Sequence, residues 1–379
     1  MDFEYSEEQQ LLADSVRKYL ANSYGFEARK KIIASSTGAG DSAWATFAEM
    51  GITAIPFSAE DGGFGGGAVD LMATMEAFGE SLVVEPLLDC IGLAGRLVAR
   101  AGSPAQRATV LPGLIDGSRK LAFASFEPGR RYELEPAATT AVQTGAAWTL
   151  NGEKRVVIGA ALADTVVLSA RTAHGASLFL VERGAPGVAI RCYRTVDGQR
   201  AGTVLLSDVR VTGDALLGSE GAALPWIEEA VDFATALLCA DAVGTMKSAC
   251  DATLEYLKTR KQFGTPIGSF QALQHRMVDM FIACEQARSM AILAACNVDA
   301  TAGATDDAAA VVERKCAVSS AMVRVADAAR LISQESVQLH GGMGMTEEMK
   351  VSHSFRRLTM LAQRFGDADH HLARYAALY

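Results

Sequence analysis

The sequence has little of what holds small secreted proteins or structural zinc sites together. Its seven cysteines are scattered over 379 residues, and no two of them form a Cys-x-x-Cys pair. This odd number and this spacing fit neither a disulfide framework nor a zinc site. We therefore interpret the cysteines as small core residues and expect no metal centre.

Long apolar runs and an excess of positive charge are also missing. Half of the residues are hydrophobic, yet no uninterrupted apolar run reaches the about 18 residues of a membrane span. The formal net charge of −9 argues against the basic surface that nucleic-acid binding needs. The acidic start, Met-Asp-Phe-Glu-Tyr, differs from a secretory signal. We expect a cytoplasmic protein with neither a membrane span nor a nucleic-acid partner.

Hydrophobic periodicity divides the chain into three parts. An amphipathic helix is expected at 6–22, with Ser6 as its cap, and further helical patterns continue to about residue 120. Alternating β-branched runs then dominate, with Asn151-Gly152 as a hairpin signal. From about residue 221 the strand pattern ends. Long helical segments follow at roughly 222–260, 269–301, 305–338 and 347–377.

This order predicts an α+β, mainly α, fold. We expect an N-terminal helical domain at 1–120, a middle β domain at 121–220 and a C-terminal four-helix bundle at 221–379.

The stretch 258–274 joins the first two long helices. Gly264 can take the positive φ that closes a helix, Pro266 stops the helix, and Ser269 is a suitable N-cap for the next one. Arg260 and Gln271 flank this turn, so a guanidinium lies beside a helix start that can bind a diphosphate. From local chemistry alone, a plain surface hairpin is the alternative reading.

Two motifs in the C-terminal half give the chain a family resemblance. Arg260-Lys-Gln-Phe263-Gly followed by Gln271, and the turn Gln338-Leu-His-Gly341-Gly342-Met-Gly344, resemble two segments of the acyl-CoA dehydrogenase family. The order of the three domains resembles that family over essentially the whole chain. In the family both segments clasp the ADP half of an FAD whose flavin lies in the neighbouring subunit. The resemblance therefore implies FAD binding by the seven residues Arg260, Phe263, Gln271, Gln338, Gly341, Gly342 and Gly344.

The β domain resembles the family in outline, including Glu127-Pro-Gly129 and Asn151-Gly-Glu-Lys154, but not in its flavin-facing details. The family's Thr-Glu-Pro-Gly-x-Gly-Ser-Asp is replaced here by Phe126-Glu-Pro-Gly-Arg-Arg-Tyr-Glu133. Its Trp-Ile-Thr-Asn, which covers the flavin, is replaced by Val156-Val-Ile-Gly159. The resemblance thus implies that the hydroxyl donors and the ring contact to the chain's own flavin are lost.

Dehydrogenation of an acyl-CoA thioester also needs a carboxylate base that faces the flavin. The two positions at which the family places its glutamate hold Gly366 and Ala234 here, and Asp367 is the candidate beside the first. Asp232 coincides with a family position that contacts CoA, although a solvated helix aspartate would look the same in the sequence.

The retained residues are those that one subunit donates to its neighbour's FAD. The chain is similar to the small subunits of heteromeric members of the family, namely the pimeloyl-CoA dehydrogenase type and bacterial steroid side-chain dehydrogenases. This resemblance implies a heterotetramer with a homologous catalytic chain, a role in lipid or steroid degradation, large or dicarboxylic acyl-CoA substrates, and an electron-transferring flavoprotein as acceptor.

Three alternatives stay open at this point. The chain can be a self-sufficient homo-oligomeric dehydrogenase with Asp367 as base, or a flavoenzyme similar to nitroalkane oxidase, which uses an aspartate base. It can also be an acyl-CoA-binding or scaffold protein without flavin, although nothing structural demands Arg260, Gln271 and the glycine turn together.

Overall fold

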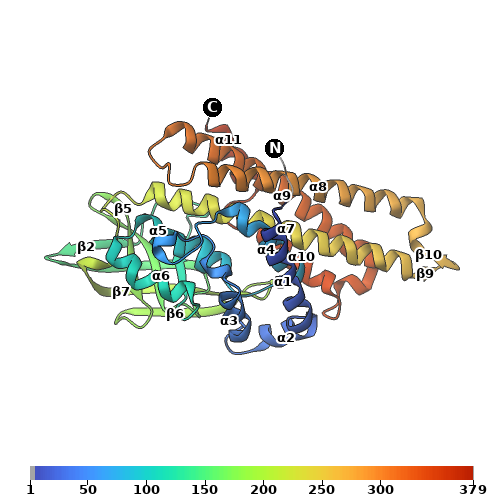
Figure 1. The fold of residues 1–379 in the computed structure, drawn as a ribbon, viewed down its shortest axis with the longest axis horizontal. Helices are drawn as coiled ribbons and strands as arrows, with labels where there is room; N and C mark the ends of the chain where they lie inside the picture. Colours follow the sequence, from blue (N-terminus) through green and yellow to red (C-terminus); the bar gives the residue numbers. More distant parts are fainter. Residues whose placement is uncertain (1–4, 379) are drawn as a thin grey trace.

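The computed structural model describes residues 5–378, and its chain begins with a lobe of helices (Figure 1). Ser6 caps the first helix by accepting a hydrogen bond from the Gln9 N–H, as predicted. The α-helices of this lobe are α1 (Glu7–Ser23), α2 (Phe26–Ala34), α3 (Asp41–Glu49), α4 (Ala68–Ser81), α5 (Arg96–Ala101) and α6 (Pro104–Ile115). A π-helical segment, η3 (Leu88–Gly95), runs directly into α5. Short 3-10 turns lie at η1 (Ile52–Ala54) and η2 (Ala59–Asp61).

The middle lobe is a mostly antiparallel sheet. Its strands are β1 (Leu121–Ala124), β2 (Thr140–Thr144), β3 (Ala147–Ile158), β4 (Thr165–Thr172), β5 (Gly175–Glu182), β6 (Val188–Arg194), β7 (Arg200–Thr212) and, after the 3-10 turn η4 (Gly213–Ala215), β8 (Leu216–Leu217). They follow the order β6-β7-β3-β2-β4-β5-β8, and β1 pairs in parallel with β4. The sheet has its own small core, in which Trp148 and Phe179 pack edge to face.

The expected hairpin at Asn151-Gly152 is wrong. Both residues lie inside the continuous strand β3, where the register against β7 shifts between Leu150 and Gly152. The chain instead reverses between Thr144 and Ala147. A bulge explains the sequence signal, because an Asn-Gly pair suits an irregular strand residue as well as a turn.

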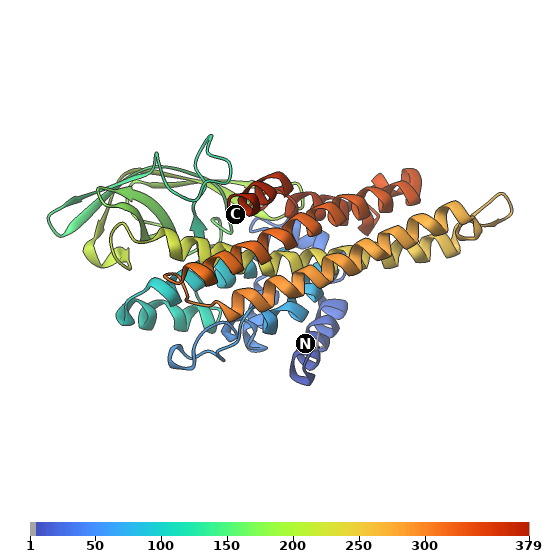
Figure 2. The same ribbon diagram turned by 90° about the horizontal axis from the view of Figure 1, so that it is seen from above.

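The C-terminal lobe consists of long helices that run between the sheet and a protruding hairpin (Figure 1, Figure 2). The helices are α7 (Leu224–Thr259), α8 (Gln271–Ala300), α9 (Ala308–His340), α10 (Lys350–Leu361) and α11 (Ala368–Ala376). The strands β9 (Lys261–Gln262) and β10 (Thr265–Pro266) form the hairpin, followed by the 3-10 turn η5 (Ile267–Ser269). Another 3-10 turn, η6 (Gly341–Met345), ends α9.

Two details of the expected bundle are wrong. The segment 347–377 is not one helix, because the chain turns between α10 and α11 with Phe365 at φ 57° and Gly366 at φ 132°. Ser269 does not cap α8, since its hydroxyl donates to the Pro266 carbonyl and the helix begins after Phe270. Gly264 does take the predicted positive φ, at 79°.

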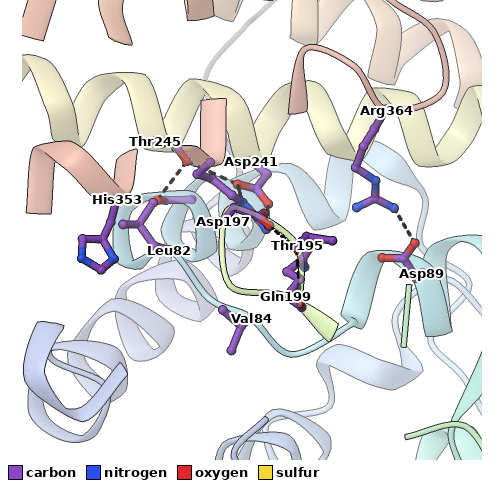
Figure 3. Close-up of polar contacts among 12 residues, drawn as sticks. Leu82, Val84, Asp89, Thr195, Asp197, Gln199, Asp241, Thr245, His353 and Arg364 are labelled. Carbon is purple, nitrogen blue, oxygen red and sulfur yellow. Dashed lines mark hydrogen bonds and ion pairs between the residues drawn. The ribbon is translucent and has the colours of Figure 1, made fainter. Parts of the chain in front are cut away.

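A buried network of charges fixes the three lobes to one another (Figure 3). Arg29 of α2 donates to the Asp197 carbonyl of the β6–β7 loop and contacts His353 of α10 at 3.1 Å. Arg357 of α10 forms ion pairs with the Asp197 carboxylate at 3.0 Å and with Asp241 of α7. Removal of one partner would leave an uncompensated buried charge, so this network ties α2, the β6–β7 loop, α7 and α10 together.

Among residues 5–378, no helix has the length and apolar character that crossing a membrane requires.

Candidate functional site

Four of the predicted cofactor residues lie in one groove near the β9–β10 hairpin, which we call the outer groove. Arg260, Gln338, Gly341 and Gly342 line a space of about 560 Å³ between the end of α7 and η6. His340 forms part of the same wall, where its ring stacks on Tyr256 with the centroids 4.4 Å apart. Residues about 80 positions apart in the sequence are therefore brought together as the two motifs predicted.

The groove offers groups that are free to bind an anion. Within the described residues the exposed Arg260 guanidinium makes no hydrogen bond or ion pair, and no heavy atom would lie within 4 Å of a Cβ at Gly341 or Gly342. Gly341 has φ 61°, which favours glycine. An unpaired guanidinium beside backbone that a ligand can approach closely fits a diphosphate such as that of FAD.

The other three predicted cofactor residues lie outside this groove. Gln271 is the exposed first residue of α8, and Phe263 is 91% exposed at the tip of the hairpin, with φ 53°. Gly344 is buried, and a Cβ there would lie 2.7 Å from the Val337 carbonyl oxygen. Gly344 therefore packs η6 against α9, while Phe263 and Gln271 point to surface that another chain can cover.

A second space, which we call the inner cavity, lies between the sheet and the bundle. It has a volume of about 330 Å³. Its wall comes from η3, from the loop that follows β1, from β3, from α7 and from the α10–α11 turn. The substituted family positions Phe126, Tyr132, Val156 and Ile158 all line it.

The loop after β1 contains Glu127-Pro-Gly129, which matches the family motif, and a buried ion pair fixes its position. Lys154 Nζ lies 3.0 Å from the Glu127 carboxylate, which also accepts hydrogen bonds from the N–H groups of Ala137, Ala138 and Thr139. Burial alone would raise the pKa of Glu127, but these contacts lower it to about 2. Glu127 and Lys154 therefore fix the shape of the loop, and the Glu127 carboxylate is bound by these contacts although the residue also lines the inner cavity.

The changed part of the same loop reaches across to the bundle. Tyr132, at the position of the family's serine, packs its ring 5.1 Å from that of His370. Its hydroxyl lies 3.4 Å from both Gln363 and Asp367. Arg131, with φ 47°, forms an ion pair with Asp367 at 3.3 Å. Arg131, Tyr132 and Asp367 therefore connect the β1 loop to the α10–α11 turn beside the inner cavity.

Neither of the usual base positions can supply a base in this structure. Ala234 is fully buried in α7. Gly366 has φ 132°, and a Cβ there would lie 2.4 Å from His370 Cδ2 and 2.7 Å from His371 Nε2. No larger residue fits at 366 unless both imidazole rings move.

Asp367 is engaged elsewhere. One carboxylate oxygen caps α11 by accepting from the His370 N–H at 2.9 Å, and the other faces Arg131 and Tyr132. The residue lines two shallow outer openings rather than the inner cavity. This geometry fits a helix cap better than a base.

The predicted contact between Asp232 and CoA conflicts with the structure. Asp232 is fully buried, and its two oxygens pair with Arg314 at 3.0 Å and Arg374 at 2.7 Å. Both oxygens take part in buried ion pairs, so this carboxylate fixes α7 to α9 and α11. The sequence could not distinguish this from a solvated aspartate, because both arginines are distant in the chain.

Sequence reasoning missed a charged pair in the inner cavity, Asp89 of η3 and Arg364 of the α10–α11 turn (Figure 3). Burial raises the pKa of Asp89, and the Arg364 guanidinium opposes this rise. An aspartate within the apolar run Leu87-Leu-Asp-Cys-Ile91 was the only signal in the sequence.

Comparisons with known proteins agree with the three lobes. Models of the acyl-CoA dehydrogenase N-terminal, middle and C-terminal domains match residues 6–118, 122–209 and 224–377. The chain is 32% identical to the acyl-CoA dehydrogenase FadE12 of Mycobacterium tuberculosis over 363 residues, which cover 92% of this chain and 89% of the relative.

Two solved structures of heteromeric proteins are similar over nearly their full length. The ChsE4-ChsE5 complex from Mycobacterium tuberculosis gives a TM-score of 0.89 at 26% identity, covering 100% of this chain and 98% of that one. A variant of the Tcur3481-Tcur3483 steroid ACAD gives 0.86 at 29% identity, covering 98% and 97%. The predicted fold class is confirmed, and this chain belongs to the acyl-CoA dehydrogenase family of FAD-dependent oxidoreductases that act on CH–CH bonds.

Proposed function

We propose that this chain is the non-catalytic subunit of a heteromeric acyl-CoA dehydrogenase and completes the FAD site of a homologous partner chain. One observation carries the proposal. The outer groove keeps Arg260 and the Gly341-Gly342 turn free for a ligand, whereas the base position at Gly366 is closed by His370 and His371.

The outer groove supplies binding rather than chemistry. The Arg260 guanidinium and the backbone of η6 would hold the diphosphate of a partner's FAD, and Gln338 would donate or accept beside them. The exposed Phe263 at the hairpin tip supports the same arrangement, because a large apolar side chain that is 91% exposed gains stability when a partner covers it.

The reaction itself would take place on the partner. When bound, FAD accepts the hydride from the β carbon of the acyl-CoA thioester. Removal of the α proton needs a carboxylate base. Gly366 and Ala234 have no carboxylate, and that of Asp367 already caps α11 and pairs with Arg131. The similarity to a steroid ACAD favours large acyl-CoA substrates. The similarity to a subunit of the caffeyl-CoA reductase-Etf complex of Acetobacterium woodii, 29% identical over 319 residues, favours an electron-transferring flavoprotein as acceptor.

The first test is to purify the chain alone and after co-expression with a homologous acyl-CoA dehydrogenase chain from the same genome. Absorbance and native mass should show a colourless lone chain that becomes a yellow heterotetramer with the partner. A yellow homo-oligomer with turnover from the lone chain would overturn the proposal. A colourless chain that never gains flavin with any homologous partner would instead favour a binding or scaffold protein.

A variant of the groove makes the test specific. Arg260→Ala should weaken FAD retention by the heteromer about 10–100-fold, because hydrogen bonds between charged groups contribute about 1.5–3 kcal/mol. The matched control is Lys258→Ala, which removes another exposed cation, one that pairs with Glu255 on the same helix. Equal FAD retention in the two variants would contradict a role for the outer groove.

A further inference from the structure

The inner cavity holds two buried oxygen atoms that have no hydrogen-bond partner. Asp89 Oδ2 and Ser125 Oγ are unsatisfied within the described residues, and both side chains line the cavity. Each residue is only 5% exposed. Buried polar atoms are costly unless a ligand or an ordered water completes their hydrogen bonds, so the pair indicates a built polar end of a binding site.

Much of the remaining wall is apolar, including Leu93, Phe123, Phe126, Leu134, Val231 and Phe365. The polar residues Glu127, Tyr132 and Gln363 also line the cavity. Arg131 and Arg155 line it as well, with side chains that are 79% and 54% exposed and therefore reach solvent. The cavity thus offers a polar inner end, an apolar body and cations toward water, and about 330 Å³ is enough for a small amphipathic ligand.

The charge at the inner end selects a neutral group. Arg364 pairs with one oxygen of Asp89 and leaves the other free, so the pair carries no net charge (Figure 3). An ammonium group would add a positive charge beside Arg364, and a carboxylate would face the free oxygen of Asp89. A hydroxyl adds no charge and donates the one hydrogen bond that Asp89 lacks.

The same pairing makes Asp89 a hydrogen-bond acceptor rather than a base. If Asp89 took a proton from a substrate, the nearly buried Arg364, whose side chain is 10% exposed, would lose its counter-charge. That loss is unfavourable in a low-dielectric site. Asp89 therefore suits recognition of a ligand and leaves the missing base of this chain unreplaced.

We propose that the inner cavity binds an apolar molecule with a hydroxyl group at its inner end, which donates a hydrogen bond to Asp89 Oδ2. Ser125 Oγ donates to an oxygen of the same ligand, and the opposite end, polar or anionic, lies near Arg131 and Arg155. A hydroxylated acyl chain has this chemistry. The proposal rests on the proposed function in one respect, since the cavity must be free of a flavin of this chain.

Isothermal titration of the full chain with two matched probes tests this assignment. The probes are ω-hydroxydecanoic acid and decanoic acid, which differ only in the terminal hydroxyl. The hydroxylated acid should bind about tenfold more tightly, because it satisfies a charged acceptor that the plain acid leaves unpaired. Equal affinities, tighter binding of decanoic acid, or no binding of either acid would overturn the proposal.

Two variants identify the residues responsible. The double variant Asp89→Leu/Arg364→Met replaces the ion pair by apolar groups of similar size and should abolish the preference while decanoic acid still binds. Ser125→Ala should reduce the preference several-fold without disturbing the pair. A preference that survives the double variant would mean that the hydroxyl binds elsewhere, and it would overturn the proposal. A thermal melt of each variant confirms that it is folded.

The outcome is separable from that of the proposed function. Flavin absorbance of the same sample reports whether the cavity contains a flavin of this chain. A yellow lone chain with no preference for either acid would overturn both proposals. A colourless chain without the preference would overturn only this one, and a clear preference in a chain that never forms a heteromer would leave only the proposed function wrong.

Discussion

The outer groove and the α10–α11 turn both belong to the C-terminal lobe, but the glycines in these two regions have opposite surroundings. In the outer groove, Gly341 and Gly342 have no heavy atom within 4 Å of a would-be Cβ, and the Arg260 guanidinium has no partner within the described residues. In the turn, Gly366 is enclosed by His370 and His371. The first region leaves space and a free guanidinium for something outside the chain, and the second is filled by side chains of the chain itself.

The two glycines have different structural roles. Gly342 leaves room for a ligand to approach the backbone, whereas Gly366 makes room for side chains of its own chain. Both are glycines in a loop near a family motif, so the sequence treats them alike. Only the packing shows that one is an open surface and the other a filled position.

The largest expected effect comes from adding a methyl group to each glycine. Gly366→Ala should destabilise the chain by roughly 2–4 kcal/mol, because it combines an unfavourable φ of 132° with overlap against two imidazole rings. Gly342→Ala should change the unfolding free energy by no more than about 0.5 kcal/mol, since its surroundings are open. Denaturant unfolding of the two variants measures the difference.

The same two variants should reverse their order in a second assay. Gly342→Ala should lower FAD retention by the co-expressed heteromer, because the added methyl group keeps the backbone from the diphosphate, while any folded Gly366→Ala protein should retain FAD. If Gly366→Ala proved harmless to folding, position 366 would be open, and Gly366→Glu would become the direct way to test for a restored base.

The second-largest expected effect is a pH dependence of the unfolding free energy that arises from His371, beside Gly366. Burial, followed by the neighbouring Arg374 and His370, lowers the pKa of His371 to about 3 from a usual 6.5. The folded state therefore favours the neutral ring. The stability it contributes is complete above pH 6.5 and is lost as the pH falls from there toward 3, with a slope of up to about 1.4 kcal/mol per pH unit.

His371→Gln, whose side chain stays neutral, isolates this contribution. The unfolding free energy of the variant should vary less between pH 6.5 and 5 than that of the original chain, by up to about 2 kcal/mol over that interval. Above pH 7 the slopes of the two proteins should be parallel. Identical slopes below pH 6.5 would mean that His371 is not the buried neutral ring that closes the turn.

Much of this arrangement could be predicted from the sequence. The order of helical, β and helical lobes followed from hydrophobic periodicity, and two motifs sufficed to predict that Arg260 and Gly341 lie together. Such signals are local, because each motif carries its own turn chemistry and its own glycines. The family resemblance also predicted that neither usual position of the glutamate holds a base, since these positions are Gly366 and Ala234.

What the sequence could not predict depends on contacts between distant segments. The Asp89–Arg364 pair joins residues 275 positions apart, and Asp232 meets Arg314 and Arg374 only after the bundle forms. The break at residues 362–367 was missed for a related reason. The turn depends on a positive φ at Phe365, which is rare for a residue with a side chain and is not marked by the residue type.

The smallest expected effect is also the one that separates the two readings of the turn. Asp367→Asn keeps a good N-cap for α11 but removes the charge that faces Arg131 and Tyr132. Because the ion pair is largely exposed on the Arg131 side, the unfolding free energy should fall by less than about 1 kcal/mol. Turnover by the heteromer should not change. An aspartate that abstracts the α proton would instead lose catalysis by about 10²-fold or more as asparagine, with FAD retained. Steady-state kinetics of the co-expressed complex, with Asp369→Asn as a control for an exposed carboxylate two residues away, therefore decides whether the turn is filled or catalytic.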